Sequence, residues 1–338
     1  MLAAVLATDV VRDLVATAGA PTNRIIAPAG VRPFLTAALA TDREAGGGGV
    51  PVLLVTATGR EAEVATAAVG DLLGDDNVMI FPSWETLPHE RLSPRADTVG
   101  KRLATLRRLA HPEQDPRGPV SVVVATIRSL IQPMAPDLGE LAPVSLKVGD
   151  WIDLGDLVDR LVTMAYTRVE MVEKRGEIAV RGGILDVFPP TESHPLRVEF
   201  FGDEVTDIRT FAATDQRSID PVDTLTAPAC REILLTEEVR ARAAQLSAGG
   251  TSDPTLAEML GKLAAGIAVE GMEALIPVLV PGRLTLLPEL LPAGTHVVLA
   301  DPERIRTRAE DLVRTGADFL AASWMAAATG GKAPIDLA

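Results

Sequence analysis

Three short apolar runs, separated by stretches long enough for helices, limit the possible folds most strongly. They are PVLLVT at 51–56, VMIF at 78–81 and VSVVVA at 120–125. Runs this apolar are typical of strands buried on both faces, and parallel strands need long crossover connections. Helical patterns after Thr58 and over about 95–110 supply those crossovers. The first part of the chain therefore predicts an α/β domain with a parallel sheet.

Other elements are expected around this sheet. Helical patterns occupy 1–19 and 30–40, and a short strand is expected at 23–28. Near the end of the chain, a strand at 295–300 is followed by a charged amphipathic helix at 303–315. A strand followed by a helix fits a return to the first sheet.

The pattern changes near residue 145, where closely spaced strands replace the alternation of strands and helices. The expected elements are a helix at 153–164 and strands at 178–180, 184–188, 197–201 and 205–211. Strands joined by such short connections pair in antiparallel fashion. We therefore expect a small α+β domain inserted into the larger α/β domain, with helices returning after residue 225.

Composition limits the classes of function. The 338 residues are enough for two or three domains, and the net charge of −14 argues against non-specific DNA binding as the main function. Cys230 is the single cysteine, so we expect no disulfide framework and no cysteine-rich zinc site, as fits a reducing cytoplasm. The four histidines lack the spacing of metal ligands, and no run of about 20 apolar residues could span a membrane.

A nucleotide site, if present, should follow the first apolar run. A phosphate-binding loop needs glycines whose N–H groups face the phosphates, a lysine, and a hydroxyl that binds magnesium. Residues 56–61 read TATGRE instead, with one glycine and no lysine. Thr58 and Glu61 have the spacing of a helix-capping box. Asp301 and Glu303, separated by a proline, are better interpreted as helix-capping residues than as a magnesium site. We expect no ATP hydrolysis and no cofactor in this chain.

Two groups of motifs together resemble a known family. The first is FPSWETLP at 81–88, which continues to Leu106; the second comprises YTRV at 166–169, EKRGE at 173–177, RGGILDVFP at 181–189, RVEFFGDE at 197–204 and QRS at 216–218. This order closely resembles the N-terminal region of the bacterial transcription-repair coupling factors (Mfd). That region is itself similar to the excision-repair helicase UvrB. The resemblance covers about 25–225 well and the rest more weakly.

The resemblance implies both an architecture and a function. It implies a degenerate RecA/P-loop-like α/β domain, with a UvrB-like domain 1a at 1–144, an inserted domain 2 at 145–222 and domain 1b at 223–338. Domain 2 is the UvrA-binding module of the family. Intact family members recognise stalled RNA polymerase and move along DNA with an ATP-driven motor; we expect those polymerase and DNA contacts to lie in C-terminal domains beyond this chain. The expected activity of the chain itself is docking UvrA.

Four residues are candidates for that docking surface. Arg181 directly follows the expected strand at 178–180. If the alternation of buried and exposed positions continues, Arg181 should face outward, and Gly182 and Gly183 leave room for a partner. By resemblance, Arg168 and Arg181 match arginines of the family's UvrA-contacting surface, Phe188 is an apolar anchor, and Arg197 is a weaker candidate. An exposed arginine pairs well with a partner's carboxylates.

Three of the four candidates also have a purely structural explanation. Arg168 could cap the preceding helix, Phe188 could pack into the core, and Arg181 could form a local salt bridge with Glu177 or Asp186. The tryptophan in the 81–88 segment could simply pack against the sheet.

Two other functions compete with UvrA docking. The chain could be a UvrB-type ATP-dependent helicase that verifies damage, which the missing lysine loop disfavours, or a DNA-binding scaffold, which the acidic balance disfavours. The resemblance also suggests a regulatory hypothesis. C-terminal domains of the intact protein would cover the docking surface until it is needed.

Overall fold

A computed structural model describes residues 2–20, 22–87, 92–249, 253–280 and 282–328. The end of the FPSWETLP motif, Pro88, lies outside the described residues. The chain divides into two compact units. The first comprises residues 1–83, 105–133 and 285–317, and the second comprises 84–104, 134–284 and 318–338.

The first unit is built on a four-stranded parallel sheet. Its strands are β1 (Val52–Thr56), β2 (Val78–Phe81), β3 (Val122–Thr126) and β12 (His296–Leu299), in the order β12-β1-β3-β2. Every residue of β1 and β3 is buried, as expected for central strands, whereas β12 at the edge alternates between half-buried and exposed residues. The predicted return of the chain to the first sheet is therefore confirmed.

Helix α4 (Gly59–Leu73) connects β1 to β2 and packs against the sheet through Ala62 and Val69. Its start is set by the predicted capping box. The Thr58 hydroxyl accepts from the Glu61 backbone N–H, and the Glu61 carboxylate accepts from the Thr58 backbone N–H. Helix α3 (Arg32–Ala40) lies against α4 and β1.

Three expectations for the first unit need correction or extension. Residues 23–28 form no strand, because the segment pairs with no sheet and runs instead into a short 3-10 turn at Ala29–Val31. The expected helix at 1–19 is two helices, α1 (Leu2–Leu6) and α2 (Asp9–Thr17), with a break at Ala7 and Thr8. Helix α11 (Pro302–Ala328) is longer than the charged segment that predicted it.

The second unit contains a six-stranded sheet in the order β10-β9-β8-β7-β6-β5. The strands are β5 (Thr167–Arg168), β6 (Glu177–Arg181), β7 (Ile184–Val187), β8 (Leu196–Phe201), β9 (Glu204–Phe211) and β10 (Ser218–Pro221). All neighbours are antiparallel except β5 and β6, which are parallel. The four strands predicted in this region and their antiparallel pairing are confirmed.

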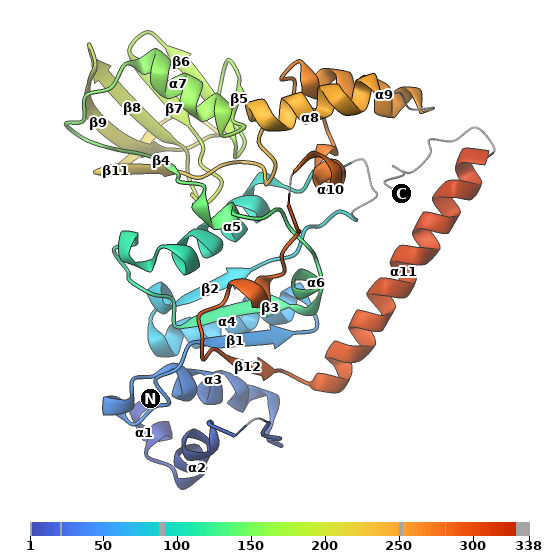
Figure 1. Ribbon diagram of the computed structural model, residues 1–338. Coiled ribbons are helices and arrows are strands. Elements are labelled where there is room, and N and C mark those ends of the chain that lie inside the picture. The colour runs from blue at the N-terminus through green and yellow to red at the C-terminus, as the bar shows by residue number, and fades with distance from the viewer. Residues whose placement is uncertain (1, 21, 88–91, 250–252, 281, 329–338) are drawn as a thin grey trace. The chain divides into compact units, whose positions relative to one another are not determined.

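Helix α7 (Leu154–Thr163) covers one face of this sheet, as Figure 1 shows. Its buried residues Leu157 and Leu161 pack with Leu185, Val198 and Ile208 of the strands, and all five side chains are fully buried. The alternation of RVEFF determines this packing, because a strand points every second side chain to the same face. The sheet and α7 therefore form a two-layer α+β domain.

The pairing of strands continues past residue 222. Strand β11 (Thr224–Ala227) pairs in antiparallel fashion with β4 (Val144–Lys147), and both contribute buried residues to the α7 core. After it come the helices α8 (Glu237–Ala248), α9 (Pro254–Ala264) and α10 (Ile276–Leu279), which belong to the second unit and not to the unit of the parallel sheet.

The remaining helices are α5 (Ala96–Ala110) and α6 (Ile127–Leu130). None of the helices, within the residues described, is long and apolar enough to cross a membrane.

A buried ion pair joins distant segments of the second unit. Arg102 of α5 pairs with Glu232, and both side chains have zero exposure. The Trp84 indole N–H also donates to Glu232, at 2.9 Å, and Arg102 lies over the Trp84 ring. A charge this deeply buried is tolerated only with a partner, so this cluster fixes the tryptophan segment in place. Trp84 is therefore a buried structural residue held by Arg102 of α5 and by Glu232.

We expect the replacement Arg102→Met to lower the free energy of unfolding by about 3–5 kcal/mol, because it leaves the Glu232 carboxylate buried without its cation. Denaturant unfolding of the purified chain measures this. The double variant Arg102→Met/Glu232→Leu should recover part of the loss. Lys262→Ala, which removes an exposed ion pair with Glu258, is the control and should change little. Equal effects of Arg102→Met and Lys262→Ala would contradict the assignment.

Burial raises the pKa of the Cys230 thiol to about 12. The thiolate is the reactive form, so at pH 8 the folded protein should react with iodoacetamide far more slowly than the unfolded chain. Mass spectrometry of alkylated protein with and without denaturant checks this. Equal labelling rates in both states would show that Cys230 is accessible.

Candidate functional site

The face of the six-stranded sheet opposite α7 is the candidate docking surface, and we call it the open face. Its side chains come from alternate positions of four strands: Arg181 of β6, Ile184 and Asp186 of β7, Arg197, Glu199 and Phe201 of β8, and Glu204, Asp207 and Arg209 of β9. Their neighbours in sequence, such as Val198 and Ile208, point into the α7 core. Arg197, Glu199 and Phe201 of β8 therefore share one face.

Arg181 lies at one end of a row across the open face. It is paired with Ile184, which is paired with Glu199, which is paired with Asp207. Its side chain is exposed, and one guanidinium N–H donates to the backbone carbonyl of Glu170 at 2.6 Å. A guanidinium has five N–H groups, so this bond fixes the side chain and leaves donors for a partner.

The local salt bridge considered for Arg181 does not form among the described residues. The Glu177 carboxylate instead accepts from the backbone N–H groups of Glu173 and Lys174, both at 2.8 Å. Asp186 is paired with Arg197. The predicted outward position of Arg181 is therefore confirmed.

The two glycines after Arg181 have different roles. Gly182 has a φ of +61°, which only glycine adopts readily, and a Cβ there would meet nothing within 4 Å. A Cβ on Gly183 would lie 3.0 Å from the Phe200 carbonyl oxygen. Gly183 thus allows close strand packing, and the expectation that both glycines leave room for a partner is wrong for this one.

Arg197 is held within the domain. Its guanidinium donates two hydrogen bonds to the Asp186 carboxylate, at 2.7 and 2.8 Å, and lies 4.6 Å from the centroid of the Phe211 ring. The hydrogen bonds to Asp186 raise the pKa of Arg197. Since this pair is bidentate and Asp186 is buried, Arg197 mainly stabilises the sheet. Most of its hydrogen-bond donors are therefore already used within the domain, so Arg197 is poorly suited to anchor a partner directly.

A second ion pair network was missed from the sequence. Arg209 donates to Asp207 at 2.6 Å and to Glu199 at 2.9 Å, and all three side chains are about one-third exposed. The sequence VTDIRTF at 205–211 indicates part of this network, because Asp207 and Arg209 are two residues apart in a strand and so share a face. This network gives the centre of the open face a fixed pattern of charges.

Phe188 is not an exposed anchor, and this prediction is corrected. Its side chain is buried at 6% exposure, in a cluster with Val172, Ala179 and Phe211, and Arg175 lies 5.0 Å from its ring centroid. The loop that follows β5 covers this part of the sheet. The alternative interpretation, that Phe188 packs into the core, holds.

Arg168 is exposed but lies on the other side of the sheet from Arg181. In β5 it is paired with Ile178, whose side chain is in the α7 core. Its side chain does not bond to the end of α7 within the described residues, so the helix-capping interpretation is wrong. A partner that covers the open face could reach Arg168 only around the β5 edge.

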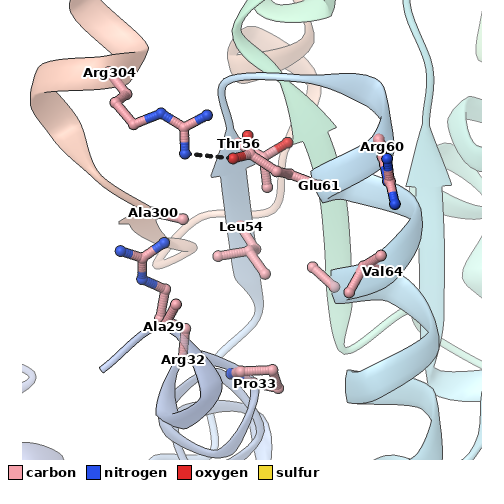
Figure 2. A pocket seen from close by; sticks show the side chains of 11 residues that line it. Ala29, Arg32, Pro33, Leu54, Thr56, Arg60, Glu61, Val64, Ala300 and Arg304 are labelled. Carbon is pink, nitrogen blue, oxygen red and sulfur yellow. Dashed lines mark hydrogen bonds and ion pairs between the residues drawn. The ribbon is translucent and has the colours of Figure 1, made fainter. Parts of the chain in front are cut away.

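The place where a nucleotide would bind has a different arrangement. The Thr58 hydroxyl and the Glu61 carboxylate each accept a hydrogen bond from a backbone N–H at the start of α4. Arg304 of α11 forms an ion pair with Glu61 at 2.6 Å. Figure 2 shows Arg304 and Glu61 meeting beside a cavity. The volume of this cavity is about 330 Å³, and Leu54 and Val64 also line it. A carboxylate of the chain therefore stands where a phosphate-binding loop would present free N–H groups to an anion.

Asp301 caps the start of α11, as predicted, whereas Glu303 forms an ion pair along the helix. The Asp301 carboxylate accepts from the backbone N–H of Arg304 at 3.4 Å, and Glu303 pairs with Arg306 one turn later. Both carboxylates therefore have structural partners within the helix.

Comparison with known proteins agrees with this geometry. Residues 144–231 match the model of the UvrB interaction domain family. The transcription-repair-coupling factor of Mycobacterium tuberculosis is 54% identical over 324 residues, which cover 93% of this chain and 26% of that protein. The transcription-repair-coupling factor of Bacillus subtilis is 32% identical over 235 residues, covering 69% of the chain and 19% of that protein.

The chain thus spans about a quarter or less of the length of these curated relatives. The matched domain contains all the strands of the open face as well as β4 and β11. The chain belongs to the transcription-repair coupling factor family.

Proposed function

We propose that this chain is a docking module that binds UvrA through the open face and does not itself hydrolyse ATP. Within an intact coupling factor, the module would recruit nucleotide excision repair to stalled RNA polymerase. Contacts with polymerase and DNA would belong to other domains of the intact protein. Those domains could also cover the open face when no repair is needed.

The observation that carries this proposal is the match of residues 144–231 to the UvrB interaction domain, together with the charged face of that domain that α7 does not cover. The face is held rigid by the Asp186–Arg197 and Glu199–Arg209 ion pairs. A rigid surface loses little conformational entropy on binding, which favours affinity.

Arg181 is the residue of this face best suited to contact a partner. Its hydrogen bond to Glu170 fixes the side chain, and its remaining N–H groups fit the carboxylate of an acidic side chain on UvrA. Arg168, at the β5 edge, would add a second cationic contact if UvrA extends around that edge.

Two observations support the absence of ATP hydrolysis. Residues 56–61 lack the lysine that contacts the phosphates, and Glu61 places negative charge at the start of α4. Its pairing with Arg304 gives that charge a partner within the chain.

We expect Arg181→Ala to weaken binding to purified UvrA by about 1–3 kcal/mol, because it removes a charged anchor from the proposed contact. Isothermal titration calorimetry measures this. Arg217→Ala is the matched control, since Arg217 is an exposed arginine of the same domain that lies outside the open face. Unchanged binding in a folded Arg181→Ala variant would remove this residue from the interface.

In a steady-state assay with magnesium and ATP, we expect phosphate release by the purified chain at the background rate. A functional UvrB preparation serves as positive control. Turnover that persists after further purification, and that is lost in an Arg304→Ala variant, would contradict the proposal and assign activity to the α4 site.

A further inference from the structure

The β8–β9 hairpin end of the open face carries two strongly exposed aromatic side chains. Trp151 is 73% exposed and Phe201 is 80% exposed. The whole chain has only three tryptophans and seven phenylalanines. Exposed aromatic groups that lie close together on a small domain indicate a contact surface.

Strand register places a carboxylate between the two rings. Glu204 is paired with Phe201 across the β8–β9 hairpin. On the other side of β9, its backbone forms an antiparallel β-bridge with Trp151. Residues directly opposite in antiparallel strands point to the same face. Trp151, Glu204 and Phe201 therefore form a row on the open face, and we call this row the aromatic corner.

The backbone holds this row in place. The N–H of Ile152 donates to the Asp203 carbonyl at 2.8 Å, and the N–H of Val205 donates to the Asp150 carbonyl at 2.9 Å. Ile152 packs against the α7 core and Val205 is fully buried within it. Their neighbours in the chain, Trp151 and Glu204, therefore point to the opposite face. Two strand spacings, about 9–10 Å, separate the positions of the two aromatic residues.

The carboxylate of Glu204 differs from the other acidic groups of the open face. Asp186, Glu199 and Asp207 are each paired with an arginine. The side chain of Glu204 has no hydrogen bond or ion pair with any residue that the structure describes. The neighbouring turn residue Asp203 is exposed and adds further negative charge.

This arrangement favours a cation over an apolar group. A guanidinium or ammonium group between two rings can lie within about 6 Å of each ring centroid and gain cation–π attraction from both. At the same time it can pair with Glu204. An apolar group that covered the corner would leave the Glu204 carboxylate desolvated and unpaired, which is unfavourable.

We propose that Trp151, Glu204 and Phe201 form a receptor for an arginine or lysine side chain of the protein that docks on the open face. The inference rests on the docking function proposed above and extends it. The open face then has two charged contacts of opposite sign. Arg181 takes an acidic group of UvrA and the aromatic corner takes a basic one, which fixes the orientation of the partner.

The experiment is a titration of purified UvrA into the whole chain, with the variants Trp151→Ala, Phe201→Ala and Glu204→Gln. We expect each to raise Kd by about 3- to 30-fold, the range of a desolvated cation–π or ion-pair contact. Trp151→Phe keeps an aromatic ring and should retain most of the affinity. Glu204→Gln should also reduce the dependence of Kd on salt concentration, which a purely structural effect would not do.

Two controls separate the receptor from general effects. Asp203→Asn removes one negative charge beside the corner but not the charge between the rings, and should have a smaller effect than Glu204→Gln. Val162→Ala removes an exposed apolar side chain from α7, on the opposite side of the domain, and should bind like the unchanged chain. Because the aromatic side chains are exposed, their removal should leave the unfolding midpoint nearly unchanged.

The outcomes separate this inference from the docking function. If Arg181→Ala weakens binding and the three corner variants bind normally, the receptor is overturned and docking stands. If the unchanged chain does not bind UvrA, both are overturned. If Trp151→Ala and Phe201→Ala instead abolish self-association of the chain, the corner contacts a second copy and the proposal is also overturned.

Discussion

The alternation of side chains along β8 and β9 is the constraint on which the functional surface depends. Val198 and Ile208 must be buried against α7, so Arg197, Glu199 and Arg209 must lie on the other side. A shift of register by one residue would reverse both faces. The same alternation of side chains therefore determines both the core of the small domain and its charged surface.

The charged side chains on that surface differ in what they can do. Arg197 is bound to the buried Asp186, and Arg209 joins two acidic groups, so these pairs make the surface rigid. Arg181 keeps donors free, and Glu204 has no partner among the described residues. Residues whose bonds are already satisfied shape the surface, and those with unused donors or acceptors are the ones that can recognise another protein.

How much could be predicted from the sequence depended on how local each interaction is. The buried strands, the Thr58–Glu61 capping box and the outward position of Arg181 follow from neighbouring residues, and all are confirmed. The sequence left open whether Phe188 is an exposed anchor or a core residue, because its burial depends on a loop that folds over the sheet. The pairing of Arg102 with Glu232, and the bridge between Trp151 and Glu204, join residues far apart in sequence and require the three-dimensional register.

The most direct test of the docking surface is hydroxyl-radical footprinting of the chain with and without UvrA, read by mass spectrometry for each side chain. The account predicts that Ile184, Trp151 and Phe201 on the open face lose reactivity in the complex, and that Val162 of α7 keeps it. Protection of Val162 with unchanged reactivity of Trp151 and Phe201 would show that UvrA binds the other side of the domain and would contradict the account.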